Sequence, residues 1–146
     1  MDAPHYVVNA EAAVHRDGEY LVVERAAAEE HAAGALALVG GTVEVSEGRD
    51  VLEATVRREV EEEVGVTVGL VAYVTNSAFE TPDDRVVNTV FLAEYASGTA
   101  RPRDPDEVAA VHWLTPDEVR DHPDAPQFTA DYVDAVDAHR IERRQS

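Results

Sequence analysis

The sequence contains no cysteine and no lysine, so all twelve of its basic residues are arginines. Without cysteine the chain has no disulfide, no thiolate metal ligand and no cysteine nucleophile. It also lacks an N-terminal basic segment followed by a long apolar run, and no later segment approaches the length of a membrane span. These absences favour a cytoplasmic protein.

Thirty acidic residues give the chain a formal net charge of −18. A surface this negative repels phosphates and anionic lipids, so we expect neither nucleic-acid polymers nor membranes as partners. An anionic substrate would therefore require a metal ion. Salt screens the self-repulsion of such a chain, and this composition leads us to the hypothesis of a halophilic protein.

A length of 146 residues with 45% hydrophobic content predicts one domain, residues 1–146. Two hairpins are expected, residues 5–14 with 19–24 around Asp17-Gly18, and residues 66–79 with 86–95 around a turn at 81–84. Further expectations are a loop at 26–34, an apolar run at 35–39 ended by Gly40-Gly41, a strand at 108–114, a helical turn at 116–120 and a helix at 128–140. The irregular order predicts a mixed sheet covered by helices.

Residues 50–64 carry the strongest helix pattern. Apolar residues recur there at every fourth position, namely Leu52, Val56, Val60 and Val64. Asp50 is placed to cap the helix with Glu53 in a capping box, and Gly65 is typical of a helix C-terminus. We therefore expect both ends of this helix to be encoded locally.

Three glutamates, Glu59, Glu62 and Glu63, fall within an arc of about 100° that borders the apolar stripe. The C-terminal end of a helix disfavours negative charge, and Glu59 and Glu63 repel each other, each effect costing a few tenths to about 1 kcal/mol. A bound cation would remove this conflict, and carboxylate ligands favour Mg²⁺ or Mn²⁺ over Zn²⁺. A solvated acidic face explains the three glutamates equally well if they are considered alone.

The flanking sequence favours the interpretation that these glutamates bind a cation. Residues 41–47, Gly-Thr-Val-Glu-Val-Ser-Glu, and 58–66, Arg-Glu-Val-Glu-Glu-Glu-Val-Gly-Val, closely resemble the Nudix box. That motif begins with Gly, five further residues and Glu. After a spacer it continues with R-E-U-x-E-E-x-G-U, where U is aliphatic. The spacer after Glu47 holds ten residues here, against the usual seven, so Asp50 competes with Glu47 for the first glutamate position.

The resemblance implies an α/β (α+β) fold, a Nudix-like α/β/α sandwich with a mixed sheet flanked by helices. It also implies a Mg²⁺-dependent (or Mn²⁺-dependent) hydrolase that cleaves the pyrophosphate bond of a nucleoside diphosphate linked to another moiety. Such substrates include nucleoside triphosphates, ADP-ribose and sugar nucleotides. The alternative is a non-catalytic module that senses a nucleotide, which would not need the glutamates. Since many relatives are dimers, a homodimer is a further expectation.

Carried onto this sequence, the motif makes Glu62 and Glu63 the principal metal ligands. Glu59 would share in metal binding or orient water, and Arg58 would position glutamate side chains through an ion pair. The backbone carbonyl of Gly40 would add a ligand, and Gly41 would permit close backbone approach.

Outside the motif, Glu107 is the first choice for the general base, with Glu94 and Glu80 as alternatives; an exposed loop charge is the competing interpretation of Glu107. Arg25 and Arg85 are candidates for binding substrate phosphate, as are Arg101 and Arg103, because the guanidinium fork fits phosphate. Surface ion pairs would explain these arginines equally well. Five aromatic residues are candidates either for the core or for base stacking, namely Tyr73, Phe79, Phe91, Tyr95 and Trp113.

Two results are expected if a dication binds among the helix glutamates. Mg²⁺ should raise the thermal midpoint of the protein and support pyrophosphate cleavage, because the ion binds only the folded state. Glu62→Gln should abolish turnover while leaving the fold intact. Turnover assays and thermal melts of the variant test this, and unchanged turnover would contradict it.

Overall fold

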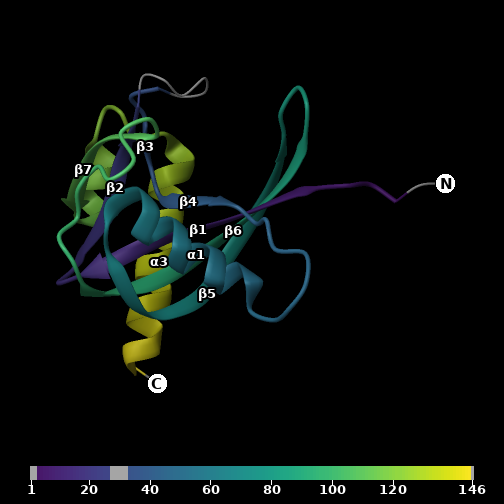
Figure 1. Ribbon diagram of the computed structural model, residues 1–146. Helices are drawn as coiled ribbons and strands as arrows, with labels where there is room; N and C mark the ends of the chain where they lie inside the picture. The colour runs from purple at the N-terminus through teal and green to yellow at the C-terminus, as the bar shows by residue number, and fades with distance from the viewer. Residues whose placement is uncertain (1–2, 27–32, 146) are drawn as a thin grey trace.

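The computed structural model describes residues 3–26 and 33–145 (Figure 1). Its strands are β1 (Val7–Arg16), β2 (Glu19–Arg25), β3 (Leu36–Ala37), β4 (Val39–Thr42), β5 (Thr67–Glu80), β6 (Arg85–Ser97) and β7 (Val108–Leu114). Its helices are α1 (Val51–Val64), α2 (Pro116–Asp121) and α3 (Gln127–Gln145). The predicted strands and helices are therefore present, with some changes at their ends.

The strands form one mixed sheet. The order β3-β2-β1-β6-β5 makes up its main path, β4 pairs with β1, and β7 pairs with β2. The β1 and β6 strands are parallel, whereas the other pairs are antiparallel. Both predicted hairpins are confirmed. Asp17 and Gly18 have the positive φ angles that a tight two-residue turn requires, 51° and 81°.

Helices cover both faces of the sheet (Figure 1). Because side chains alternate across a strand, β2 sends Leu21 and Val23 into one core, with α1, and Tyr20 and Val22 into a second core, with α2 and α3. The same alternation puts Phe91 of β6 in the first core and its neighbours in the second. The expected α/β/α sandwich is confirmed.

Helix α1 lies on the sheet through Val56, Val60 and Val64, all fully buried. The predicted C-terminus is confirmed, since Gly65 has a φ of 72° and its N–H donates to the carbonyl of Glu61 at 3.0 Å. The predicted capping box at Asp50 is wrong. Asp50 is itself left-handed, with a φ of 54°, and this conformation leaves its side chain without a capping hydrogen bond.

Gly40 and Gly41 do not end a strand as predicted, because they lie within β4 and pair with β1. A Cβ atom at Gly40 would lie 2.4 Å from the carbonyl oxygen of Ala10, so β4 approaches β1 more closely than a side chain would allow. Glycine usually weakens a strand, but here the close pairing outweighs that tendency. The predicted loop at 26–34 lies mostly outside the described residues.

The C-terminal helices close the second face. Thr115 and Glu118 form a complete capping box at the start of α2. Helix α3 is longer than predicted and buries Ala130, Val133 and Val136. Within residues 3–26 and 33–145, no helix is both long and apolar enough to cross a membrane.

The left-handed conformation of Gly65 leads to a stability prediction. Gly65→Ala should lower the free energy of unfolding by about 1–2 kcal/mol, because an L-residue is disfavoured at this φ. Gly69→Ala is the matched control, since its Cβ would make an ordinary contact, 3.8 Å from the carbonyl oxygen of Glu94. The control should stay within about 0.5 kcal/mol of the parent in urea unfolding. Equal effects of the two substitutions would contradict the prediction.

Candidate metal and substrate site

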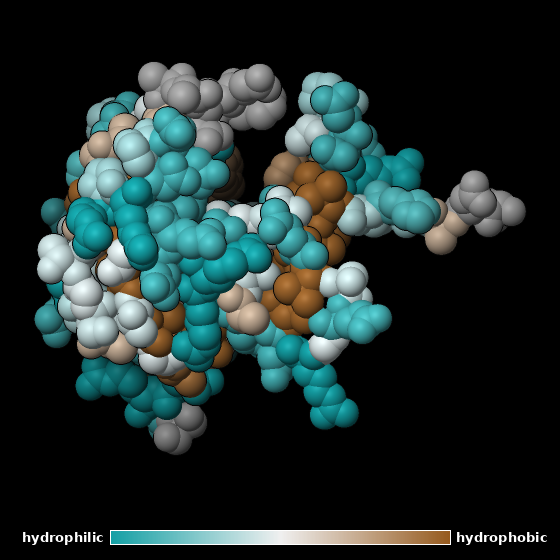
Figure 2. All heavy atoms as spheres, in the orientation of Figure 1, coloured by the Kyte–Doolittle hydropathy of each residue, from teal (hydrophilic) through white to brown (hydrophobic). Residues whose placement is uncertain are grey.

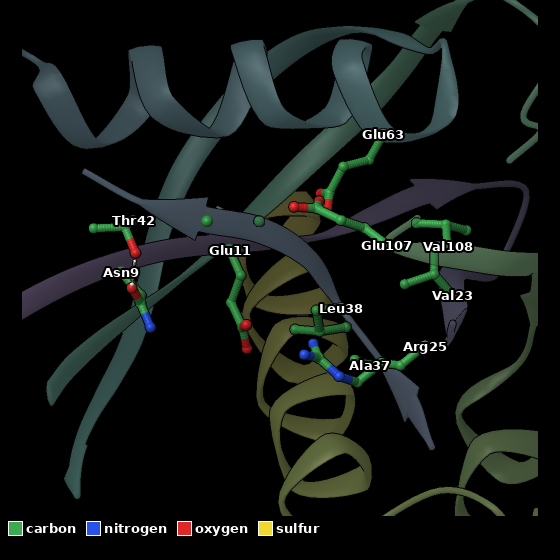
Figure 3. Close-up of a pocket in the computed structure, with 12 residues that line it drawn as sticks. Asn9, Glu11, Val23, Arg25, Ala37, Leu38, Thr42, Glu63, Glu107 and Val108 are labelled. Atoms are coloured by element: carbon green, nitrogen blue, oxygen red, sulfur yellow. Dashed lines mark hydrogen bonds between the residues drawn. The ribbon is translucent and has the colours of Figure 1, made fainter. Parts of the chain in front are cut away.

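Three carboxylates meet where α1 passes β4. Glu59 and Glu63 project from α1, and Glu107 comes from the residue before β7. Each offers an oxygen, and these oxygens lie within 4.8 Å of one another. Figure 3 shows the side chains of Glu63 and Glu107 pointing toward each other. The sheet thus brings a distant residue to the motif helix.

Glu63 is the most buried member of this acidic group, with 8% of its surface exposed. Burial, followed by a hydrogen bond and charge repulsion from Glu107 and then the charge of Glu59, raises the pKa of Glu63 to about 9. The N–H of Gly40 donates to the carboxylate and opposes this shift. The Oε2 atom of Glu63 is buried and, within residues 3–26 and 33–145, has no hydrogen-bond partner. The neighbouring charges that shift this pKa, those of Glu107 and Glu59, are therefore both negative.

Arg58 and Gly41 set the position of Glu59. Arg58 Nη2 donates to Glu59 Oε1 at 3.0 Å, and its Nη1 lies 3.7 Å from Glu44 Oε2. A Cβ atom at Gly41 would lie 2.7 Å from Glu59 Cδ, so glycine allows the carboxylate to lie against β4. Burial raises the pKa of Glu59, and the hydrogen bond from Arg58 opposes this.

The remaining motif acids lie outside this group. Glu62 is exposed, although its charge contributes to the raised pKa of Glu59. Glu47 and Asp50 are exposed in the loop between β4 and α1, which contains the lengthened spacer. Arg103 Nη1 donates to the carbonyl of Glu61 at 3.1 Å, so an arginine from another segment supplies positive charge at the end of α1.

The acidic group suits a hard divalent cation. Its donors are all carboxylate oxygens, the ligands that Mg²⁺ and Mn²⁺ prefer. The orphaned Oε2 of Glu63 is the kind of atom that a metal ion satisfies. In the described part of the chain, no other set of three acidic or histidine side chains meets the same distance criterion. The residues present therefore fit the ion that the sequence leads us to expect.

The other two base candidates have different partners. Glu94 Oε2 lies 2.8 Å from His15 Nδ1. Glu80 is exposed and lies 3.9 Å from Arg85 at the end of the β5–β6 hairpin. Neither belongs to the acidic group, whereas Glu107 does.

One cavity adjoins the acidic group, and a second cavity adjoins the first. The smaller, of about 240 Å³, is lined by Glu63, Glu107, the glycines of β4 and Arg25 (Figure 3). The larger, of about 650 Å³, is mostly apolar. They share Asn9, Glu11, Arg25 and Ala37. A single ligand with a charged part and a less polar part can therefore extend across both. Arg85 lines neither cavity.

The surface around these cavities is partly apolar. Figure 2 shows hydrophobic side chains gathered where the β5–β6 hairpin leaves the rest of the molecule. Phe79 of β5 and Phe128 of α3 line the larger cavity and are 48% and 57% exposed. Of the five aromatic candidates, Phe91 is fully buried in the first core, and Trp113 packs beside that core with Arg16 against its ring.

The sequence analysis did not identify Glu11 as a site residue. Burial raises its pKa to about 7, while a hydrogen bond from Asn88 and the charge of Arg25 oppose the shift. Glu11 lies on β1 two residues before Ala13, on the face that α3 covers. A carboxylate two residues before the buried Ala13 was the available signal, but it does not indicate which cavity the side chain lines.

The comparisons with known proteins agree with this fold. A family model described as NUDIX domain matches residues 5–135. The NAD-capped RNA hydrolase NudC of Escherichia coli O1:K1 is 36% identical over 107 residues, 73% of this chain, and the chain spans 38% of that relative's length.

Solved structures have the same fold. A MutT NUDIX hydrolase from Burkholderia pseudomallei superposes with a TM-score of 0.75 at 28% identity, over 90% of this chain and 98% of that one. The MutT protein of Methanosarcina mazei Go1 has a TM-score of 0.76 at 24% identity, over 96% and 98% of the two chains, which supports the fold. From its motif, its fold and these matches, the chain belongs to the NUDIX domain family.

Proposed function

We propose that this protein is a Mg²⁺-dependent or Mn²⁺-dependent hydrolase that cleaves the pyrophosphate bond of a nucleoside diphosphate linked to another moiety. The observation that carries the proposal is the acidic group of Glu59, Glu63 and Glu107 beside a cavity, with Glu63 buried. Without a cation, this arrangement keeps a carboxyl protonated at neutral pH and leaves one of its oxygens unpaired. A bound dication would favour the ionised carboxyl and would pair with this oxygen.

In this proposal Glu59 and Glu63 hold the ion beside Glu107, and Glu62 and the carbonyl of Gly40 remain further ligands expected from the motif. A bound dication neutralises phosphate oxygens and lowers the pKa of a water molecule. Arg58 holds the Glu59 carboxylate in place through its 3.0 Å hydrogen bond. The chain's own part is to fix these carboxylates before substrate binds.

We assign proton transfer to Glu107. It is exposed, in contrast to Glu63, and it lines the smaller cavity. A general base needs both access to water and hydrogen-bond reach of the reacting group. Arg25 lines both cavities and is the arginine we assign to substrate phosphate. Arg85, the other candidate, lies at the hairpin end beside Glu80 and has no role in this proposal.

The substrate class follows from the paired cavities. The phosphates belong beside the acidic group, and the attached nucleoside belongs in the larger, apolar cavity. NAD-type dinucleotides, named in the relatives' activity, and ADP-ribose, bound by the NUDIX domain of Shewanella oneidensis NrtR, both contain such a diphosphate. We include them with nucleoside triphosphates in the activity screen. The intact glutamates argue against the sensing alternative, and a homodimer stays a prediction.

The central test is Glu63→Gln. This substitution removes a charge from the acidic group but keeps the side-chain shape, so kcat/KM with Mg²⁺ should fall at least about 100-fold, since even residues behind the ligands cost about 10–100-fold. Glu61→Gln is the matched control, because Glu61 lies on the same helix, is exposed and is outside the group. It should retain activity. Equal activity of the two variants would overturn the proposal.

The raised pKa of Glu63 also predicts how stability depends on pH without metal. The carboxyl titrates near 4.5 when unfolded and near 9 when folded, so the folded state binds more protons between these values. The stability from the protonated carboxyl is complete below pH 4.5 and is lost as the pH rises toward 9.

In EDTA, the thermal midpoint of the parent should therefore fall more steeply from pH 5 to 9 than that of Glu63→Gln. Glu11, with a raised pKa of about 7, contributes in the same direction in both proteins, so the difference between them isolates Glu63. Identical slopes would show that the carboxyl is ionised in the metal-free fold.

A further inference from the structure

Asn88 is a buried amide with one half of its hydrogen-bonding capacity unused. It lies on β6 and is 5% exposed. Its Nδ2 donates to Glu11 Oε1 at 3.1 Å and to the Tyr132 hydroxyl at 3.3 Å. Its Oδ1 is buried and has no hydrogen-bond partner among the residues that the structure describes. Since buried acceptors are nearly always paired, this oxygen points to a missing donor.

The side chain lines the larger cavity. That cavity, of about 650 Å³, has the size of small-molecule sites, which run from about 300 to 1,000 Å³. Phe79 and Phe128 also line it and keep about half of their surfaces exposed. Exposed aromatic rings around a buried polar group suit a flat heterocycle that stacks and forms an edge hydrogen bond.

The hydrogen-bonding groups around Asn88 define what such a ring must offer. Glu11 and Tyr132 use both N–H groups of the Asn88 amide, and Tyr132 is also paired with Ser77. Asp131, a further lining residue, adds a carboxylate. The free Oδ1 accepts and cannot donate. A ring that presents an N–H is therefore favoured, and a ring that presents a carbonyl oxygen there is disfavoured.

We infer that Asn88 determines base specificity, its Oδ1 accepting a hydrogen bond from the exocyclic amino group of a nucleobase held in the larger cavity. The inference rests on the proposed function, because the shared residues Glu11 and Arg25 join this cavity to the one beside the acidic group. It adds the selection of amino-bearing bases over bases that carry a carbonyl at the same ring position.

Binding of nucleoside 5′-monophosphates tests the inference without turnover. Calorimetric titrations in EDTA, at a salt concentration that screens the net charge, should compare AMP with IMP, GMP with XMP, and CMP with UMP, pairs that carry an amino group or a carbonyl at the same ring position. In at least one pair, the amino-bearing member should bind about tenfold tighter, the effect of one net hydrogen bond at the upper end of its usual range. Equal affinities within every pair would overturn the inference.

Asn88→Leu has a similar size and no acceptor. It should reduce the difference within the discriminating pair to less than about twofold, through weaker binding of the amino-bearing member. Its binding of ribose 5-phosphate, which has no base, should not change. Thr89→Val is the matched control, because Thr89 is the next residue on β6, is buried and bonds to the backbone of Asn9. This control should keep the discrimination, and circular dichroism should show both variants folded.

The outcomes separate the two proposals. Discrimination that survives in Asn88→Leu, or that is absent from the parent, overturns the role of Asn88 even if Mg²⁺-dependent hydrolysis is present. Loss of discrimination in Asn88→Leu together with a parent that hydrolyses no diphosphate overturns the enzyme proposal and keeps the base site. Should Asn88→Leu fail to fold, equal affinities within every pair in the parent protein still overturn the inference, and Asn88→Ala takes its place as the variant without an acceptor.

Discussion

The site depends on one constraint, the burial of the Glu63 carboxyl among other carboxylates against a strand made partly of glycine. Burial and the neighbouring charges raise its pKa to about 9, and the N–H of Gly40 is the favourable contact that opposes them. Fixed carboxylates in a site of low dielectric interact strongly with a dication, because water does not screen them. The unfavourable burial of the Glu63 carboxyl in the metal-free protein is thus linked to the proposed affinity for the ion.

The fold maintains this constraint from three directions. Val56, Val60 and Val64 hold α1 on the sheet, so Glu59 and Glu63 cannot turn to solvent together. The close pairing of β4 with β1 presents Gly40 and Gly41, which have no side chains, to the carboxylates. The pairing of β7 with β2 then brings the residue before β7 to the same point.

The two cavities of the site differ in the side chains that line them. Charged groups line the smaller cavity, whereas aromatic and aliphatic side chains line most of the larger one. Glu11 and Arg25 belong to both. Such a pair of cavities allows a diphosphate to be held by charge while the attached group is selected by shape and hydrogen bonding. The net charge of −18 adds a general repulsion of anions, which a local cation and Arg25 would offset.

The sequence by itself determined the features that depend on near neighbours: the α1 stripe, its Gly65 terminus, the two hairpins and the glutamates of the Nudix box. Only the tertiary structure decided which acids meet, because strand pairing places Glu107 beside Glu63, while Glu62 is exposed. It also decided that Glu11 and Asn88 face one cavity, since residues far apart in the chain become neighbours through the parallel β1–β6 pair. The cap at Asp50 was predicted wrongly because the loop before α1 imposes a left-handed conformation that local sequence does not reveal.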